Sequence, residues 1–408
     1  MFDQFPKNKI IFIDSNSEGK EVVSAISVEA FEAAINRSKT TSESMIPFVI
    51  RPSIASLVDF FSLMQSRKSF IMCSKYDLEY VTKMMEATKL AGLKEEALIG
   101  FFTSATTGKP TIVFHDISEF IARFKPGVRP LHSICFYKPD HIAFVDVLLS
   151  TIASGGSMVL QEHFNALKAF DDIQRFNISH LFASPSFLNL MFSDAADWTK
   201  LKSLKQICYG SELLPKTLLA KIKKNLPEVS LKNIYATTQA LRPQINHDAL
   251  DATFYKFGEE GLHYRIENDE LYLRRPASLR YLIKNDQVLE APDWIATGDM
   301  VIFNTHGFYK VVGRRSDLIN VGGEKILPKH IEDILLELAE VKDVKVYGEP
   351  NAILGEIVCA DIVSSAHSIP SVLKEKIRSF AVQKLKPEEM PIKINFVTEI
   401  RLSERLKR

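Results

Sequence analysis

The sequence predicts an α/β body followed by a smaller α+β domain, and three observations support this prediction. Short β-branched and apolar runs alternate with amphipathic stretches of helical length through the first part of the chain. The pattern changes near Pro243 to short strand-like pieces, and after Asp317 to a mixed unit of about 90 residues. The 408 residues, 46% of them hydrophobic and 25% charged, are enough for two or more domains of a soluble globular protein.

The chain before Pro243 carries an alternation of strands and helices. The expected strands are residues 10–13, 69–73, 97–102, 157–160, 181–183 and 206–209. The expected helices are residues 54–65, 77–91, 142–153, 166–176, 185–192 and 215–225. This order predicts a largely parallel sheet flanked by helices.

The chain after Pro243 predicts a small β-rich subdomain over about residues 244–312, with little helix. Its expected strands are residues 271–273, 281–283, 300–303 and 308–312. An α+β unit follows, with helices at 328–338 and 369–384 and strands at 341–347, 356–363 and 394–397. The boundary near Arg315–Asp317 divides the chain into predicted domains of residues 1–315 and 316–408.

Charge and cysteine content exclude several classes of protein. The formal net charge is +1, so nothing in the total favours nucleic acid or an anionic membrane as a partner. The four cysteines are far apart and form neither a zinc motif nor a disulfide framework, which favours buried thiols in a reducing compartment. No apolar run approaches the ~20 residues of a membrane helix, and we expect a cytoplasmic protein.

A loop rich in hydroxyl groups directly follows the strand that ends at Phe102. Its candidate phosphate-binding residues are Thr103, Ser104, Thr106, Thr107 and Gly108. Backbone N–H groups and hydroxyls of such a loop can bind phosphate oxygens, although the spacing of a Walker loop is absent. The alternative is a polar surface turn.

Two further segments follow expected strands. Gly210, Ser211 and Glu212 occupy either a ligand-lining turn or an ordinary strand-to-helix turn, with Pro215 near the start of the next helix. Tyr235, Thr238 and Gln239 lie in the segment Tyr-Ala-Thr-Thr-Gln, which alone would favour a buried strand followed by a threonine-rich turn.

The strongest motif covers residues 294–332. It reads Trp-Ile-Ala-Thr-Gly-Asp at 294–299, Gly-Phe-Tyr-Lys-Val-Val-Gly-Arg-Arg-Ser-Asp-Leu-Ile at 307–319, and Gly-Gly-Glu-Lys-Ile-Leu-Pro-Lys-His-Ile-Glu at 322–332. In order and spacing it resembles the adenylate-forming ligase superfamily of acyl-CoA synthetases, and the chain resembles a short, divergent member from about Pro52 to Arg408.

The resemblance implies a role for each motif. The loop after Phe102 would bind ATP phosphates, the segment from Gly210 to Glu212 would line the adenine site, and Tyr235 would pack on adenine. Thr238 would touch the α-phosphate, and Gln239 stands where the family has a Mg²⁺-binding glutamate. The remaining implied residues are Asp299 and Arg314 at the ribose, Gly322 and Gly323 beside a thiol arm, His141 and Gly210 in the acyl pocket, and Ser316 at a hinge.

The C-terminal tail resembles the segment that carries the family's catalytic lysine. Arg405 aligns with that lysine, and Lys407 is the alternative if the loop is reshaped. The alternative is a frayed, basic, solvent-exposed tail without a catalytic role. Ala105 and Thr111 also depart from the pattern, standing where the family has a glycine and a lysine.

The implied fold is a large N-terminal domain of two α/β subdomains and a β-rich one, with a small mobile C-terminal α+β lid. The implied enzyme is an acid-thiol ligase that uses ATP and Mg²⁺, forms acyl-AMP, and passes the acyl group to coenzyme A or to the phosphopantetheine of a carrier protein, as in polyketide biosynthesis. The alternative is a degenerate ligase fold that only binds CoA or a carrier protein, or transfers thioesters. The sequence leaves open which carboxylic acid is used, and whether the protein is a monomer or homodimer.

Overall fold

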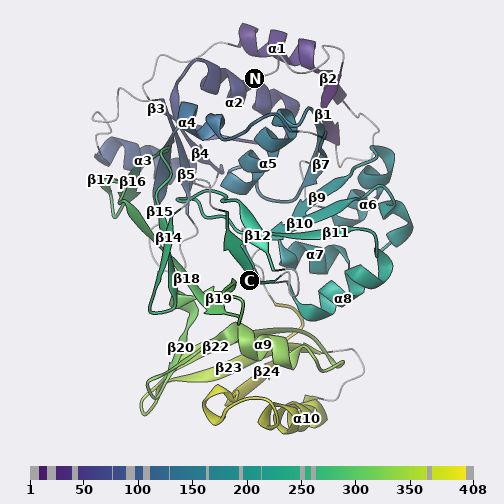
Figure 1. Ribbon diagram of the computed structural model, residues 1–408, viewed down its shortest axis with the longest axis vertical. Helices are drawn as coiled ribbons and strands as arrows, with labels where there is room; N and C mark the ends of the chain where they lie inside the picture. Colours follow the sequence, from purple (N-terminus) through teal and green to yellow (C-terminus); the bar gives the residue numbers. More distant parts are fainter. Residues whose placement is uncertain are drawn as a thin grey trace. The chain divides into compact units, whose positions relative to one another are not determined.

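The computed structural model describes most of the chain (Figure 1). The described residues are 9–15, 24–38, 45–75, 77–88, 97–103, 111–127, 129–161, 165–192, 196–212, 214–248, 253–258, 263–364 and 370–400. The chain forms two compact units, each built from three separate segments. Unit 1 comprises Met1–Ser211, Leu226–Arg242 and Arg275–Ile295, and unit 2 comprises Glu212–Asn225, Pro243–Arg274 and Ala296–Arg408.

The first sheet of unit 1 has seven strands in the order β11-β10-β9-β7-β8-β1-β2. All neighbours are parallel except β2, which runs antiparallel to β1. The strands are β1 (Ile10–Ser15), β2 (Ser24–Ser27), β7 (His132–Cys135), β8 (Ser157–Gln161), β9 (His180–Ala183), β10 (Gln206–Gly210) and β11 (Ser230–Ile234). The predicted parallel sheet is therefore present.

The second sheet of unit 1 has six strands in the order β17-β16-β6-β5-β4-β3. The strands are β3 (Met45–Val49), β4 (Ser69–Cys73), β5 (Leu98–Phe102), β6 (Ile112–Asp116), β16 (Leu279–Lys284) and β17 (Gln287–Glu290). The hairpin of β16 and β17 lies inside the range predicted for the β-rich subdomain, yet β16 pairs with β6. Burial of Leu279, Leu282 and Ile283 and the free hydrogen-bonding edge of β6 account for this placement.

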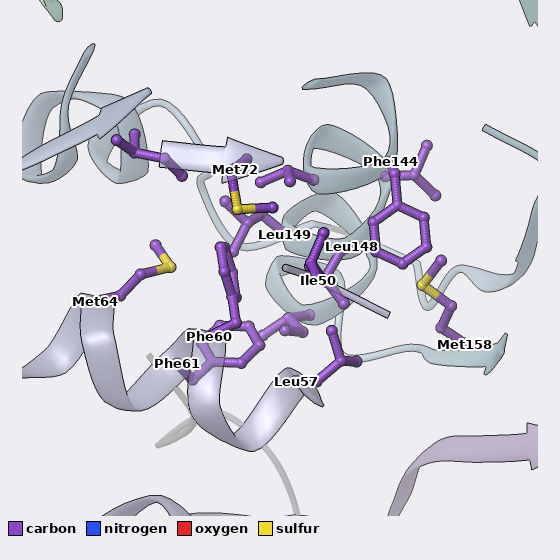
Figure 2. Close-up of a cluster of buried hydrophobic side chains, with 14 of the residues drawn as sticks. Ile50, Leu57, Phe60, Phe61, Met64, Met72, Phe144, Leu148, Leu149 and Met158 are labelled. Carbon is purple, nitrogen blue, oxygen red and sulfur yellow. The ribbon is translucent and has the colours of Figure 1, made fainter. Parts of the chain in front are cut away.

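Several helices of unit 1 share one hydrophobic core with strands of both of its sheets. The helices of unit 1 are α1 (Val28–Arg37), α2 (Ile54–Gln65), α3 (Leu78–Thr88), α4 (Ile117–Ala122), α5 (Ile142–Ala153), α6 (Ala166–Arg175) and α7 (Pro185–Met191), with a short 3₁₀ helix, η2 (Trp198–Leu201). Figure 2 shows Phe60 and Phe61 of α2 in the same buried cluster as Leu148 of α5 and Met72 of β4. Helix α5 is buried along nearly its whole length, which its uninterrupted apolar sequence requires.

Unit 2 contains a six-stranded sheet in the order β12-β13-β19-β18-β15-β14. The strands are β12 (Ile245–His247), β13 (Tyr255–Phe257), β14 (Tyr264–Glu267), β15 (Glu270–Arg274), β18 (Trp294–Phe303) and β19 (Tyr309–Arg314). Tyr255, Phe257 and Tyr309 form an aromatic cluster, with ring centroids 5.0–6.1 Å apart. Helix α8 (Lys216–Asn225) also belongs to unit 2.

The C-terminal part of unit 2 is a small α+β structure with its own core. Its sheet has the order β21-β20-β23-β22, and β24 pairs with β23. Its elements are β20 (Ile319–Val321), β21 (Glu324–Ile326), β22 (Val341–Asn351), β23 (Gly355–Ser364), β24 (Lys393–Phe396), α9 (Pro328–Leu335), α10 (Pro370–Val382), η3 (Arg315–Asp317) and η4 (Pro387–Glu389). Ile331, Val358 and Ile377 are buried in this core.

The predicted fold class is confirmed, and two predicted helices match to the residue, α2 and α5. Helix α9 ends at Leu335, three residues before the predicted end. The four cysteines are free and buried, as expected, and burial raises the pKa of Cys73, Cys135 and Cys208 to about 12. Among the described helices, none has both the length and the apolar character of a membrane span.

Candidate functional site

The carboxyl ends of four parallel strands gather the first group of candidate residues. In β7, β9 and β10, Cys135 pairs with Phe182 and Ala183 with Tyr209, so these strands end at one edge of the sheet. Strand β11 ends there too, because Gly210 pairs with Ile234. This is the edge at which parallel α/β sheets bind their ligands.

Gly210 is required by the packing of its own sheet. A Cβ atom at this position would lie 2.4 Å from the carbonyl oxygen of Ile234 on β11, which no side chain tolerates. Ser211 follows in the left-handed region, with φ at +69°, and is exposed. Glu212 is half-buried at the start of unit 2. The residues from Gly210 to Glu212 therefore form a turn at the end of β10. Their contact with adenine stays a prediction.

Thr238 and Gln239 lie at the tip of a tight turn, residues 237–241, which we call the phosphate turn. Thr237 and Leu241 exchange both backbone hydrogen bonds, at 3.1 and 2.8 Å. The Thr237 hydroxyl oxygen accepts a further bond from the Ala240 N–H at 2.9 Å. Tyr235 is half-buried between the end of β11 and this turn. The structure thus brings the predicted adenine and α-phosphate residues to the same sheet edge.

His115 on β6 holds the phosphate turn from the core. Its Nε2 lies 2.8 Å from the carbonyl oxygen of Thr238, and its Nδ1 lies 3.0 Å from the hydroxyl of Ser278. A carbonyl only accepts, so Nε2 carries the proton and Nδ1 accepts from the serine. Burial lowers the pKa of His115 to about 4, and the ring is neutral near pH 7.

The contact of His115 with Thr238 joins residues 123 positions apart, and no motif of the sequence pointed to it. The available signal was a polar residue directly after the apolar run 112–114 of the same strand, since such a residue must find partners when the strand is buried.

The predicted phosphate loop connects β5 and β6. The Thr103 N–H donates to the carbonyl of Thr111 at 2.9 Å, directly beyond the strand pair Phe102 and Ile112. The two ends of the loop therefore lie side by side. The candidates Ser104, Thr106, Thr107 and Gly108, with Ala105, lie outside the described residues.

Asp299 and Arg314 form the centre of the second group, in unit 2. They are register partners on β18 and β19, and the Arg314 Nε lies 2.8 Å from the Asp299 Oδ1. The Arg314 Nη1 also donates to the carbonyl of Thr297 at 3.0 Å. Asp299 is only 4% exposed, so its charge needs this partner. The sequence motif suggested a ribose contact for each residue, which stays a prediction, and their pairing with each other is a finding of the structure.

Glu270 supports the same corner and was missed by the sequence reasoning. Its Oε1 accepts the N–H of Gly298 at 3.1 Å, and its Oε2 lies 2.6 Å from Arg315 Nη1. Gly298 has φ of +73°, which explains the glycine of the Thr-Gly-Asp motif. We call residues 297–299 with Glu270, Arg314 and Arg315 the ribose corner. The only sequence signal for Glu270 was a carboxylate at the start of an apolar strand.

Gly322 and Gly323 form the turn of the β20–β21 hairpin. Their φ angles are +60° and +98°, and they connect the register partners Val321 and Glu324. A two-residue hairpin turn with positive φ at both positions favours glycine. The turn alone thus accounts for both glycines, and their predicted place beside a thiol arm stays a prediction.

Ser316 lies in η3, between the end of β19 and the start of β20. Its hydroxyl donates to Asp317 Oδ1 at 2.8 Å, and it is exposed. The segment is short and polar, which is compatible with the predicted hinge, and the hinge role itself is untested.

His141 caps helix α5. Its Nδ1 accepts the N–H of Ala143 at 3.1 Å, and its ring stacks on Tyr137 with centroids 6.1 Å apart. Tyr137 in turn donates to the carbonyl of Ala183 at 3.0 Å, at the sheet edge described above. His141 therefore has a structural role close to that edge, and its role in a substrate pocket remains a prediction.

The fit of the implied small molecules differs from one to another. The buried carboxylate of Asp299 suits a ribose diol, and the gathered strand ends suit a nucleotide base and its phosphates. For Mg²⁺, Gln239 offers a neutral amide oxygen, which is a weaker ligand than a carboxylate. Arg405 and Lys407 lie outside the described residues.

Two family models match this sequence. The model of the AMP-binding enzyme matches residues 13–258, and that of the AMP-binding enzyme C-terminal domain matches residues 330–407. The chain belongs to the AMP-binding enzyme family. This AMP-binding enzyme is thus an adenylate-forming enzyme by descent, and the fold has the large α/β body, the β-rich part and the small C-terminal domain of that superfamily.

Curated relatives of this AMP-binding enzyme are acid–CoA ligases. A 2-succinylbenzoate–CoA ligase of Bacillus mycoides (strain KBAB4) is 27% identical over 331 residues, which cover 75% of this chain and 67% of the relative. A 4-chlorobenzoate–CoA ligase of Arthrobacter sp. is 24% identical over 309 residues, covering 66% of this chain and 57% of the relative. The chain thus matches only 57–67% of the length of these two relatives.

A solved structure supports the fold. The anthranilate CoA ligase AuaEII, in complex with anthranoyl-AMP, superimposes with a TM-score of 0.80 at 17% identity. The match covers 98% of this chain and 92% of that one.

Proposed function

We propose that this AMP-binding enzyme binds ATP, activates a carboxylic acid as acyl-AMP, and transfers the acyl group to a thiol. The observation that carries the proposal is the ribose corner, in which a buried Asp299 carboxylate is oriented by Arg314 within the family's most specific motif. A buried carboxylate with two oxygens can accept both hydroxyls of a ribose.

The proposed chemistry has two steps. A carboxylate oxygen of the acid attacks the α-phosphorus of ATP, a new P–O bond forms, and pyrophosphate leaves. The thiol sulfur then attacks the acyl carbon, its proton passes to solvent, and AMP leaves. Thr238 and the loop residues Thr103, Ser104, Thr106, Thr107 and Gly108 would bind the phosphates, and Arg405 or Lys407 would balance the developing charge.

The acid and the acceptor are the finer part of the proposal. The relatives are named for 2-succinylbenzoate, 4-chlorobenzoate and anthranilate, which are all aromatic acids. Phe136 and Phe187 stack with centroids 4.3 Å apart, just beyond the strand ends of β7 and β9, so buried aromatic side chains lie near the candidate site. We therefore propose an aromatic acid as substrate and CoA as acceptor. A carrier protein, as in polyketide biosynthesis, is the alternative acceptor.

The proposal also includes a hinge at Ser316, between the predicted domains 1–315 and 316–408.

A second candidate function is binding without adenylation. Four positions depart from the family pattern, namely Ala105, Thr111, Gln239 and Arg405. Loss of one preorganised polar contact in an active site commonly costs about 2.7–4 kcal/mol of barrier, so several together would reduce adenylation to a trace. Under this alternative the chain binds nucleotide, CoA or a carrier protein and leaves activation to another enzyme.

Pyrophosphate exchange with a panel of aromatic and aliphatic acids separates the two functions. Exchange that requires one class of acid supports the ligase. No exchange with any acid, together with retained binding of CoA or of a phosphopantetheine-bearing carrier protein, overturns the ligase and supports the second candidate. Isothermal titration with ATP, on the wild type and on Asp299→Ala, tests the ribose corner independently of turnover.

A further inference from the structure

Strand β6 contains a polar residue where only apolar ones would be expected. Ile112, Val113, Phe114 and His115 are all fully buried. The His115 ring lies against Phe101 and Phe120, with centroids 6.4 and 5.8 Å apart. An imidazole in such surroundings is costly unless both of its nitrogens have hydrogen-bond partners.

Both partners are present, and one of them is firmly anchored. Ser278, which donates to Nδ1, is itself buried, and its carbonyl accepts the N–H of Asp116 at 2.7 Å. His115 is also the register partner of Leu279 in the β6–β16 pair. The ring is therefore fixed by the sheet, and its Nε2–H points to the carbonyl of Thr238 from a rigid base.

The far end of the phosphate turn is held separately by charge. Arg242, the residue after the turn, lies 3.3 Å from Asp146 on α5. Asp146 is mostly buried and also pairs with Arg123, at the end of α4. The turn is thus held at its base by an ion-pair network and at its tip by the imidazole.

The position of His115 along the chain connects two phosphate-binding candidates. Strand β6 begins at Ile112, directly after the loop that Thr103 and Thr111 close. The same strand then presents the imidazole to Thr238, a residue 123 positions later in the sequence. One ring therefore joins the strand of the phosphate loop to the tip of the phosphate turn.

We propose that His115 is a positioning residue for phosphate binding, which sets the main chain at Thr238 and so places the Thr238 hydroxyl against the α-phosphate. This inference rests on the proposed function. His115 acts through Thr238 and is not assigned any contact with ATP. Its role depends on the proton on Nε2, because that nitrogen faces the carbonyl of Thr238.

Two amide substitutions separate the two hydrogen bonds of the ring. The side-chain amide of glutamine reaches about as far as Nε2 of histidine, and that of asparagine about as far as Nδ1. His115→Gln can therefore still donate to Thr238, whereas His115→Asn can contact Ser278 but falls short of Thr238. His132→Asn is the control, because His132 on β7 contacts Ser157 and takes no part in the site.

The first readout is the rate of pyrophosphate exchange. We expect His115→Asn to lower kcat about 10- to 100-fold with little change in KM for the acid, since a lost buried hydrogen bond is worth about 1–3 kcal/mol. His115→Gln should stay within about threefold of the wild type, as should His132→Asn. Equal loss in the asparagine and glutamine variants overturns the proposal.

The second readout does not depend on turnover. Hydrogen exchange of the peptide that covers residues 235–243, measured by mass spectrometry, should accelerate in His115→Asn and remain near the wild-type rate in His115→Gln. ATP affinity, measured by titration, should follow the same order. A wild type that binds ATP without exchange removes the proposed ligase activity but leaves this test intact. Unchanged ATP affinity and unchanged hydrogen exchange in His115→Asn overturn the positioning role.

Discussion

The ribose corner of unit 2 and the phosphate turn of unit 1 are held in opposite ways. The ribose corner is held by ion pairs near the surface, since the side chains of Arg314 and Arg315 are 47% and 61% exposed while their carboxylate partners are buried. The phosphate turn is held at its tip by a neutral imidazole inside the core. The Asp299–Arg314 pair comes from a motif that is visible in the sequence, whereas the partners of Glu270 and of His115 lie far from them along the chain. The two regions should therefore respond differently to mutation, pH and salt.

The largest expected effect is at the ribose corner. Asp299→Ala removes the carboxylate proposed to accept both ribose hydroxyls and leaves Arg314 without its partner. Each hydrogen bond to a charged group is worth about 1.5–3 kcal/mol, so ATP should bind at least about 100-fold more weakly. Calorimetric titration measures this, with Asp293→Ala as the control, because Asp293 pairs with Arg275 at an exposed site. Wild-type affinity in Asp299→Ala would exclude a ribose contact at this residue.

The next effect is the pH dependence of stability that His115 confers. Its pKa falls from 6.5 to about 4 on folding, so between these values the unfolded chain binds more protons than the folded one. Stability should therefore fall as pH drops through 6.5, by a total of about 3 kcal/mol once the pH is below 4. Chemical unfolding of the wild type and of His115→Gln between pH 7.5 and 4 should show a flatter curve for the variant. The comparison is needed because the pKa values of His132 and His180 are also lowered by burial. If stability falls equally with pH in the wild type and in His115→Gln, His115 is not the source of this pH dependence.

Glu270→Gln should have a smaller effect. The amide oxygen of glutamine can still accept the Gly298 N–H, but the ion pair with Arg315 is lost. Because Arg315 is largely exposed, solvent screens the pair, and we expect only a small loss of stability and a loss of up to about tenfold in ATP affinity.

Raising the salt concentration should reduce the difference in stability and in ATP affinity between the wild type and Glu270→Gln, because salt screens the Glu270–Arg315 ion pair of the wild type. The His115 variants should not show this narrowing. If the difference between the wild type and Glu270→Gln does not change with salt, Glu270 acts through its hydrogen bond to Gly298 rather than through its charge.

The smallest effect is expected at the β20–β21 turn. Gly322 has φ of +60°, a conformation that asparagine tolerates, and a Cβ there would lie 3.6 Å from Leu354, an ordinary contact. Gly322→Asn should cost at most about 1 kcal/mol in stability and leave pyrophosphate exchange unchanged. Single-turnover transfer to CoA decides between the two explanations of this glycine. Normal transfer means that the turn alone requires it, and a selective loss means that a thiol arm passes close by.

The sequence predicted the fold class, and it drew attention to Asp299 and Arg314, because both depend on short-range patterns. Asp299 and Arg314 are close in the chain, and the antiparallel strands β18 and β19 make them partners. Helix α5 was predicted to the residue because its apolar run has clear ends, with His141 capping one of them.

The parts that could not be predicted depend on pairing between distant segments. The hairpin of β16 and β17 has the same alternation whether it joins the sheet of unit 2 or that of unit 1, so local pattern does not decide its sheet. The contact of His115 with Thr238 is of the same kind. Gly322 and Gly323 show a related limit of sequence-based prediction. A tight hairpin turn and the close approach of a ligand both require glycine, so the residue type alone does not tell which of the two is the cause.

The pairing of β6 with β16 also bears on how the chain is synthesised. Strand β6 is complete at Asp116, but the strand that covers its open edge ends at Lys284. A ribosome adds about 5–20 residues per second, so this edge waits roughly ten seconds or more for its partner. An uncovered strand edge is a template for aggregation, and its buried residues Val113 and Phe114 belong to the core. A fragment of this protein that stops at Pro243 would keep that edge uncovered, and we expect it to aggregate more readily than the full chain.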